Sequence, residues 1–180
     1  MDCLIRTRGM SLDYQIERGV ISDYKLLADF HYRSDRPANF VKIYTAIGCE
    51  GYGAGFRHRG SRRVIGVLVE SMPTRFCKMR DVALGGRYSG LGCGAERMML
   101  LNREMRVFSR VIVDPCWRGL GVASALVRHG LAHADTLYTE ATAMMGHVSF
   151  LSAGGCVVMC VRLMCMMRAW RGCLSLWGLG

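Results

Sequence analysis

The chain has 180 residues, a net charge of +10, and a composition that is 51% hydrophobic and 21% charged. This balance is typical of a globular protein and excludes a disordered chain, and the length fits one domain with its own core. The excess of positive charge favours anionic partners such as phosphates, nucleic acid or acidic protein segments, without choosing among them.

The cysteines predict a reducing environment. There are nine, an odd number, and none forms a CxxC pair. The N-terminal residues lack the apolar core of a secretory signal, so unpaired thiols in a cytoplasmic protein are expected. The cysteine spacing near the C-terminus matches no zinc template, and buried thiols are favoured there over a metal. Arginines interrupt the last apolar stretch, so no membrane span is expected.

The first part of the chain predicts two strands around one helix. Residues 14–20 have the pattern of a short strand, and Ser22 is expected to cap a helix that runs to residue 30. Residues 40–47 alternate and carry β-branched side chains, which predicts a second strand. The Gly- and Arg-rich residues 48–61 are expected to form a hairpin loop that contains the densest arginine cluster.

The middle of the chain begins with an apolar strand and then loses its pattern. Residues 63–72 are predicted to form a strand buried on both faces. Glycines are frequent in residues 74–101, which predicts a long flexible segment, and long loops of this kind are often functional. No Gly-Lys-Ser/Thr follows these glycines, so a Walker-type nucleotide loop is excluded.

The next elements alternate between strand and helix. Residues 105–113 predict a strand closed by Pro115, and residues 119–134 carry an apolar stripe at helical spacing. Residues 136–141 predict another strand, and a short helix is expected near residues 146–153. Together these elements predict one mixed α+β domain built around a central strand–turn–helix unit.

The turn of that unit predicts an anion site. A helix start leaves backbone N–H groups without intrahelical partners, and the helix dipole adds partial positive charge there, so a pyrophosphate can bind. Two glycines allow the backbone to approach phosphate oxygens closely. Arg118 either adds charge or packs behind the turn, and Ser124 is a further donor. The residues predicted to bind the anion are Arg118, Gly119, Leu120, Gly121, Val122, Ala123 and Ser124.

These residues carry a resemblance. The segment Val111-Ile112-Val113-Asp114-Pro115-x-x-Arg118-Gly119-x-Gly121-x-Ala123 resembles the acyl-CoA-binding motif of the GNAT acetyltransferases. The resemblance implies a central, mostly antiparallel twisted sheet flanked by helices, with a splayed strand pair at the cofactor site. It implies acetyl-CoA as co-substrate, with its pyrophosphate on the loop. By the same resemblance the backbone of Val111, Ile112 and Val113 contacts the pantetheine arm, and residues 136–141 form the splayed partner strand.

Further segments resemble one subgroup of that family, in which a GNAT-like domain is joined to an ABC-type ATPase. They are Phe30-His31-Tyr32-Arg33, Ala83-Leu84-Gly85-Gly86-Arg87-Tyr88 and Leu101-Asn102-Arg103-Glu104. The resemblance implies an ABC-type ATPase as a partner. It assigns residues 1–154 to a GNAT-like domain and leaves residues 155–180 as an atypical Cys- and Met-rich tail, with one strand of an incomplete hairpin at 155–163.

Acyl transfer to an amine needs a base to take the amine proton and donors to polarise the thioester carbonyl. Many members of the family place a Glu on or near the strand before the loop. Glu104, close to the start of that strand, and Glu140, in the next strand near the expected gap, are the predicted catalytic residues. Glu70 ends an apolar strand, and each of the three could equally be a surface salt-bridge partner. Phe150 stands near the usual position of a tyrosine acid and cannot donate a proton. His129 and His133 lie one helical turn apart, but no third ligand is evident, so no metal site is expected.

Three functions therefore remain open from the sequence. The first is an acetyl-CoA-dependent N-acyltransferase with an unknown amine acceptor. The second is a catalytically weak acyl-CoA-binding or regulatory module that works with an ATPase. The third is a basic protein associated with nucleic acid, for which salt-dependent RNA binding would be diagnostic.

Overall fold

The computed structural model describes residues 2–7, 10–31, 37, 39–48, 63–89, 93–142 and 164–168, and their side chains between residues 14 and 141. The described strands form one sheet in the order β1-β2-β3-β4-β5-β6-β7, in which neighbouring strands are antiparallel except for the parallel pair β5–β6. The strands are β1 (Asp2–Thr7), β2 (Met10–Arg18), β3 (Phe40–Gly48), β4 (Arg63–Ser71), β5 (Met105–Val113), β6 (Tyr138–Thr142) and β7 (Met164–Arg168).

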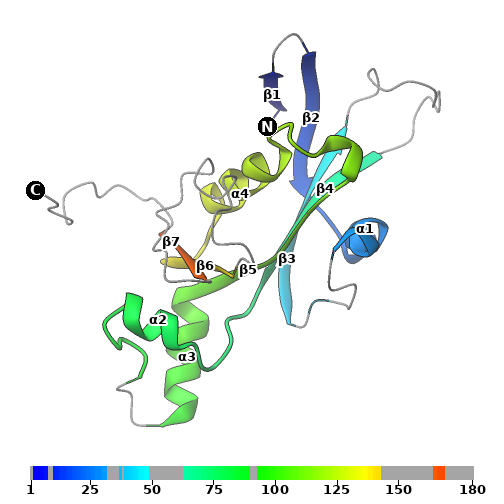
Figure 1. Ribbon diagram of the computed structural model, residues 1–180. Coiled ribbons are helices and arrows are strands. Elements are labelled where there is room, and N and C mark those ends of the chain that lie inside the picture. The colour runs from blue at the N-terminus through cyan, green and yellow to red at the C-terminus, as the bar shows by residue number, and fades with distance from the viewer. Residues whose placement is uncertain are drawn as a thin grey trace, which may run out of the picture.

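Helices cover the two faces of this sheet and one of its ends. The described helices are α1 (Ile21–Leu27), α2 (Lys78–Ala83), α3 (Gly94–Glu104) and α4 (Val122–Ala132), with short 3-10 turns η1 (Ala28–Phe30) and η2 (Pro115–Trp117). Figure 1 shows α4 and α1 on opposite sides of the central strands, while α2 and α3 project from the end of the sheet. None of the described helices is long and apolar enough to cross a bilayer.

The core is divided by the central strands into two apolar layers. Under α4, side chains of β2, β3 and β4 meet Leu126 and Val127, and under α1 other side chains of β3 and β4 meet Tyr24 and Leu27. Because β4 is covered on both sides, every residue of this strand after Arg63 is buried. The prediction of a strand buried on both faces is thus confirmed, and burial of these apolar surfaces is the main force that positions α4 on the sheet.

The sequence predicted the central strands and helix α4 correctly. It was wrong about the start of α1, because the N-cap residue is Val20, whose N–H donates to the Asp23 carboxylate at 3.0 Å, and Ser22 lies inside the helix. It was also wrong about residues 74–101, where helices α2 and α3 form in place of a flexible loop. The hairpin loop at 48–61 with its arginine cluster, the helix at 146–153 and the strand at 155–163 fall, apart from Gly48, outside the described residues.

The chain therefore forms a single mixed α+β domain with a mostly antiparallel sheet, as predicted, and this arrangement is compatible with a GNAT-like fold. The boundary proposed near residue 154 stays a prediction. Within the tail, β7 adds to the sheet as the antiparallel neighbour of β6, with Met164 opposite Thr142 and Arg168 opposite Tyr138.

Gly130 lets α4 approach the sheet closely, which gives a test of this packing. A Cβ at Gly130 would lie 2.7 Å from Cδ2 of Leu68 and 2.8 Å from Cζ of Phe108, both buried. We expect Gly130→Val to lower the free energy of unfolding by about 1–3 kcal/mol, because the extra methyl groups overpack the core. Ala132→Val, an exposed position of the same helix, controls for β-branching. Equal urea midpoints for the two variants would contradict this packing.

Candidate functional site

The connection from β5 to α4 is held in place by Asp114 and Trp117. The N–H of Asp114 donates to the carbonyl of Ile65 on β4 at 2.9 Å, and its carboxylate accepts a hydrogen bond from the N–H of Cys116 at 2.8 Å. Trp117 is buried against the layer under α4. Pro115 begins the short turn η2, which reverses the chain toward the helix. These contacts attach the loop to the end of the sheet before α4 begins.

The backbone N–H groups at the start of α4 are free. Gly119 and Gly121 have φ values of 77° and 81°, in the left-handed region that favours glycine. The first amide of this segment that finds an acceptor is that of Ala125, which donates to the Gly121 carbonyl at 3.0 Å. In the part of the chain that the structure describes, the amides of residues 119–124 have no hydrogen-bond acceptor. No side chain caps the helix either, so a row of donors remains for an anion.

The side chains of the loop leave these amides accessible. Val122 and Ser124 point into the protein and are buried, and Leu120 and Ala123 pack partly against the core. Arg118 turns back, and its Nε donates to the Val113 carbonyl at 3.1 Å. A Cβ at Gly119 would meet no atom within 4 Å, so the space beside that residue is open. Of the residues predicted to bind the anion, those from Gly119 to Ser124 thus present backbone amides, whereas the guanidinium of Arg118 lies at the end of β5.

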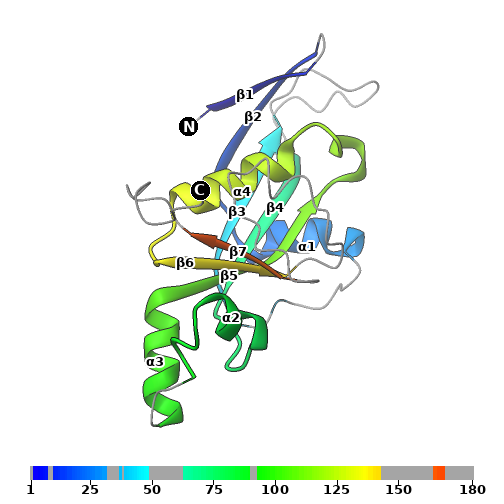
Figure 2. The same ribbon diagram turned by 60° about the vertical axis from the view of Figure 1, so that its left-hand side comes forward.

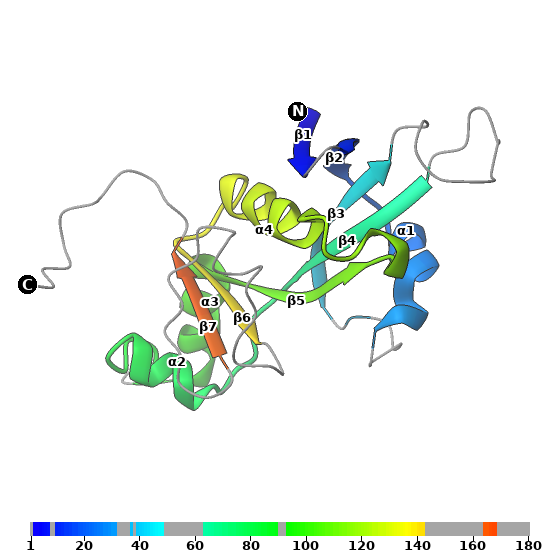
Figure 3. The ribbon, with the colours of Figure 1, turned by 45° about the horizontal axis from the view of Figure 1, so that its top comes forward.

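Strands β5 and β6 pair in parallel over four residues, and the described part of β6 ends one residue later, at Thr142. The parallel register runs from Met105 opposite Tyr138 to Phe108 opposite Ala141. Figure 3 shows the two strands starting together near α3 and separating along β5. Residues 109–113 of β5 continue to pair with β4 but have no described neighbour on their other edge. The splayed strand pair that the resemblance implies at this place stays a prediction.

The backbone of β5 presents hydrogen-bonding groups to this gap. The N–H of Asp114 donates to the carbonyl of Ile65 on β4. Hydrogen-bonded positions alternate along an antiparallel pair, so the N–H and C=O groups of Ile112 also point toward β4. The N–H and C=O groups of Val111 and Val113 then face away from β4, and the Val113 carbonyl accepts the hydrogen bond from Nε of Arg118. Ser109 is an extra residue between Phe108 and Arg110, which pair with consecutive residues of β4. Such a bulge bends the strand at the closed end of the gap.

Glu104 and Glu140, the predicted catalytic carboxylates, are both engaged in ion pairs. Glu104 accepts two hydrogen bonds of 2.8 Å from Arg87 and one of 3.0 Å from the Tyr88 hydroxyl. The bond from Arg87 holds the pKa of Glu104 below its usual range. Glu140 accepts a 2.8 Å hydrogen bond from Arg80, a pair with side chains only 1% and 4% exposed. Both carboxylates are hydrogen-bonded to arginines, so both residues have the surroundings of structural anchors.

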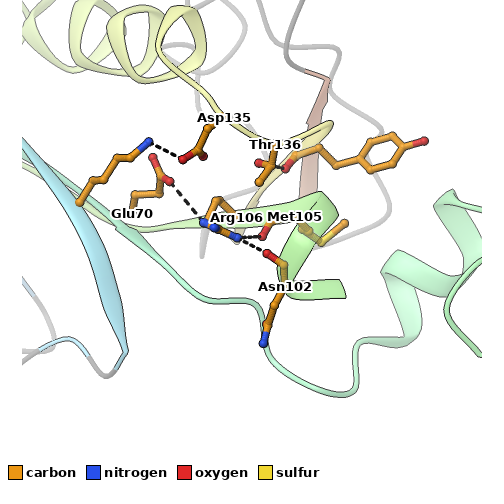
Figure 4. Close-up of polar contacts among 8 residues, drawn as sticks. Glu70, Asn102, Met105, Arg106, Asp135 and Thr136 are labelled. Carbon is orange, nitrogen blue, oxygen red and sulfur yellow. Dashed lines mark hydrogen bonds and ion pairs between the residues drawn. The ribbon is translucent and has the colours of Figure 1, made fainter. Parts of the chain in front are cut away.

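Glu70 has the surroundings that the two predicted residues lack. It lies on β4 opposite Phe108, next to the Ser109 bulge, and is 2% exposed. Its Oε1 has no hydrogen bond and stands 3.7 Å from Nε of Arg106 (Figure 4). Burial raises the pKa of Glu70, against the opposing charge of Lys42. A buried carboxyl with a raised pKa and an unsatisfied oxygen is a candidate general base.

Other ionisable groups surround Glu70 beneath the C-terminal end of α4. Lys42 on β3 binds Asp135 at 3.0 Å, and Figure 4 shows this pair beside Glu70. Burial, and then the charge of Glu70, raise the pKa of Tyr44 to about 12. His129 packs edge-on against Tyr44 and stacks on His133, with ring centroids 4.1 Å apart. Among the described residues no group of His, Cys, Asp and Glu side chains is arranged to hold a metal ion.

The sequence contained a weak signal for Glu70 and none for its surroundings. An acidic residue at the end of an otherwise apolar strand is unusual, and this is why Glu70 was noticed. Its neighbours Lys42, Arg106 and Asp135 come from three other segments, and only the sheet register brings them together. No protein-family model matches this sequence, and a search of the curated proteins finds no match. The chemistry of the site is therefore argued from its own geometry.

The buried pair Arg80–Glu140 offers a test of the structural role of Glu140. Removing one partner leaves the other charge buried without compensation, so Arg80→Met should destabilise the protein by about 3–5 kcal/mol. The double variant Arg80→Met/Glu140→Met removes both charges and should recover most of that loss. Denaturant unfolding of the three proteins measures the difference. If the double variant is no more stable than the single one, the two side chains do not form the pair described here.

Proposed function

We propose that this protein is an N-acyltransferase that moves an acetyl group from acetyl-CoA to an amine. One observation carries the proposal: the amides of residues 119–124, which have no acceptor among the described residues, lie at the start of α4, beside the edge of β5 where residues 109–113 have no described neighbour. A diphosphate bound by the amides places the chain attached to it along that edge. The N–H and C=O groups of Val111 and the N–H of Val113 can then bond the amide groups of the pantetheine arm, as an additional strand would.

The closed end of the gap is the place for the chemistry. From Val113 to Ser109 the strand extends roughly 14 Å, which separates the reacting thioester from the anion site. The acceptor amine attacks the thioester carbonyl, its proton passes to a base, and the thiolate of CoA leaves. We assign the base to Glu70, one strand away from β5 and opposite Phe108. Its raised pKa brings it closer to neutral pH, where proton transfer is most effective.

A second function, that of an acyl-CoA-binding module without turnover, is favoured by one observation. Both carboxylates that the sequence singled out, Glu104 and Glu140, are held in ion pairs. If Glu70 is not accessible to an acceptor amine, the protein binds its cofactor and transfers nothing. An ABC-type ATPase as partner and a cytoplasmic location remain parts of the proposal. Binding and turnover must therefore be measured separately.

The anion site is tested by blocking the mouth of α4. Gly121→Trp should abolish binding of acetyl-CoA in a calorimetric titration, because the indole covers the amides that bind the diphosphate. Gly85→Trp is a matched control, since Gly85 is also exposed and has a positive φ of 57° in a turn. The control carries the same backbone strain and should bind as the unchanged protein does. Loss of binding in both variants, or in neither, would mean that acetyl-CoA binds elsewhere or does not bind to this protein.

The base is tested with Glu70→Gln, which keeps the shape of the side chain and removes its proton affinity. We expect kcat to fall by about 10²–10⁴-fold, while the Kd for acetyl-CoA stays unchanged. The stability of the variant supplies a second readout. A carboxyl group whose pKa is raised in the folded state stabilises the fold below the unfolded-state pKa of about 4.5. This contribution is lost as the pH rises through the folded-state pKa. Glu70→Gln should thus be more stable than the unchanged protein at pH 7 and not at pH 4.

Glu104→Gln serves as the comparison for this experiment. Its folded-state pKa is lowered, so its contribution to stability is present at neutral pH and is lost as the pH falls below about 4.5. The variant should be less stable at pH 7 and should lose less activity than Glu70→Gln. A large drop in kcat for Glu104→Gln alone, with Glu70→Gln fully active, would return the base to Glu104.

A further inference from the structure

The segment between β4 and β5 forms an arm that has no part in the proposed reaction. Residues 72–104 leave the end of β4, form α2 and α3, and return to β5, and Figure 2 shows both helices standing away from the sheet. A small apolar cluster around Tyr88, Leu101 and Met105 holds the arm together. The ion pair of Arg80 with Glu140 attaches it to β6. The outer surface of the arm is thus built on a fixed base.

An exposed aromatic ring has two arginines close to it on this arm. Phe76 is 68% exposed. The guanidinium carbons of Arg75 and Arg97 each lie 5.1 Å from the centroid of its ring. Arg75 also packs against Gly94 at the start of α3, where a Cβ would displace it. The ring and both cations are therefore held together by the fold of the arm.

The charge of this group is poorly compensated. Arg97 has only a distant partner, with its guanidinium 3.7 Å from the Asp81 carboxylate. Arg75 and the nearby exposed Lys78 form no ion pair within the described residues. Two guanidinium groups at one ring repel each other, and an anion placed between them would relieve that repulsion. Val82 and Met99, at 63% and 73% exposed, add apolar surface to the same arm.

We infer that the arm binds single-stranded nucleic acid, with an unpaired base against Phe76 and phosphates on Arg75, Arg97 and Lys78. Single strands are bound by aromatic side chains on which bases stack, with arginines beside them for the backbone. A duplex offers no free base to this ring, and an acidic peptide has no flat partner for it. The inference does not depend on the proposed acyl transfer, since none of these residues touches the loop or Glu70.

The test uses the full chain and fluorescein-labelled oligouridine of about 12 nucleotides, with fluorescence anisotropy as the readout. Phe76→Ala should weaken binding at least about fivefold, because one stacked base is lost. The slope of log affinity against log salt concentration should stay the same for this variant. Arg75→Glu should weaken binding and also flatten that slope by about 0.7 for each phosphate that the protein no longer neutralises.

Two control variants lie on α1 and η1, on the other side of the molecule. Phe30→Ala removes a ring that is 47% exposed, and Lys25→Glu changes the net charge by the same amount as Arg75→Glu. Neither should change the affinity by more than about twofold. Thermal unfolding of each variant shows whether it is folded, and deoxy-oligothymidine tests whether the site distinguishes RNA from DNA through the 2′-hydroxyl.

Three outcomes would overturn the inference. The first is absence of measurable binding by the unchanged protein at low salt. The second is an equal loss of affinity in Lys25→Glu and Arg75→Glu with no loss in Phe76→Ala, which would show that binding depends only on overall charge. The third is that blunt duplex RNA or poly-glutamate binds as tightly as the single strand and that Phe76→Ala does not weaken this binding. That result would identify a general surface for polyanions or acidic proteins.

Discussion

The short parallel contact between β5 and β6 is the constraint on which the candidate site depends. Parallel strands cannot be joined by a tight turn, so the chain must cross over the sheet between them, and α4 is that crossover. Since α4 runs back along β5, its N-terminus lies near the end of β5 and its C-terminus near the beginning of β6. The amides of residues 119–124, without an acceptor among the described residues, and the edge of residues 109–113, without a described neighbour, therefore come to the same place for one topological reason.

Charged pairs attach β6 to the central sheet and to the arm. Asp135, just before β6, binds Lys42 on β3, and Glu140 within β6 binds Arg80 on α2. The first contact ties the start of the strand to the central sheet, whereas the second ties the strand to the arm. Burial alone raises the pKa of Asp135, but the hydrogen bond and the charge of Lys42 outweigh it, so that the pKa is lowered overall. The carboxylate of Glu140 thus anchors β6 to α2.

The sequence predicted the local features of the site, and the long-range ones were beyond its reach. The strand, the loop glycines and helix α4 are determined by neighbouring residues, and they were found at nearly the right bounds. Helix α3 was missed because the glycines before it suggested a loop. Its residues 95–104 nevertheless lack Gly, Pro and β-branched side chains, and Cys93 accepts a hydrogen bond from the N–H of Glu96 at the spacing of a helix cap.

Long-range pairs explain why the sequence did not single out Glu70. Arg80 and Glu140 are 60 residues apart, and Lys42 and Asp135 are 93 apart. A sequence without a known sheet register does not reveal such partners, so Glu104 and Glu140 looked as free as Glu70. Only the fold distinguishes a carboxylate that is hydrogen-bonded to a cation from one that is not. Phe76 did not stand out in the sequence for the same reason, because Arg97, one of the two arginines close to its ring, lies on helix α3.

Two features of the domain oppose folding, and both lie along β5. Leaving donors unpaired at the start of α4 forgoes hydrogen bonds that a capping side chain would supply, and burying Glu70 without a full partner costs desolvation energy. A sequence optimised only for stability would place Ser or Asp at the cap and Gln or Leu at residue 70. Because stability and function conflict at active sites, these two unfavourable features support the proposal that a ligand binds between the start of α4 and Glu70.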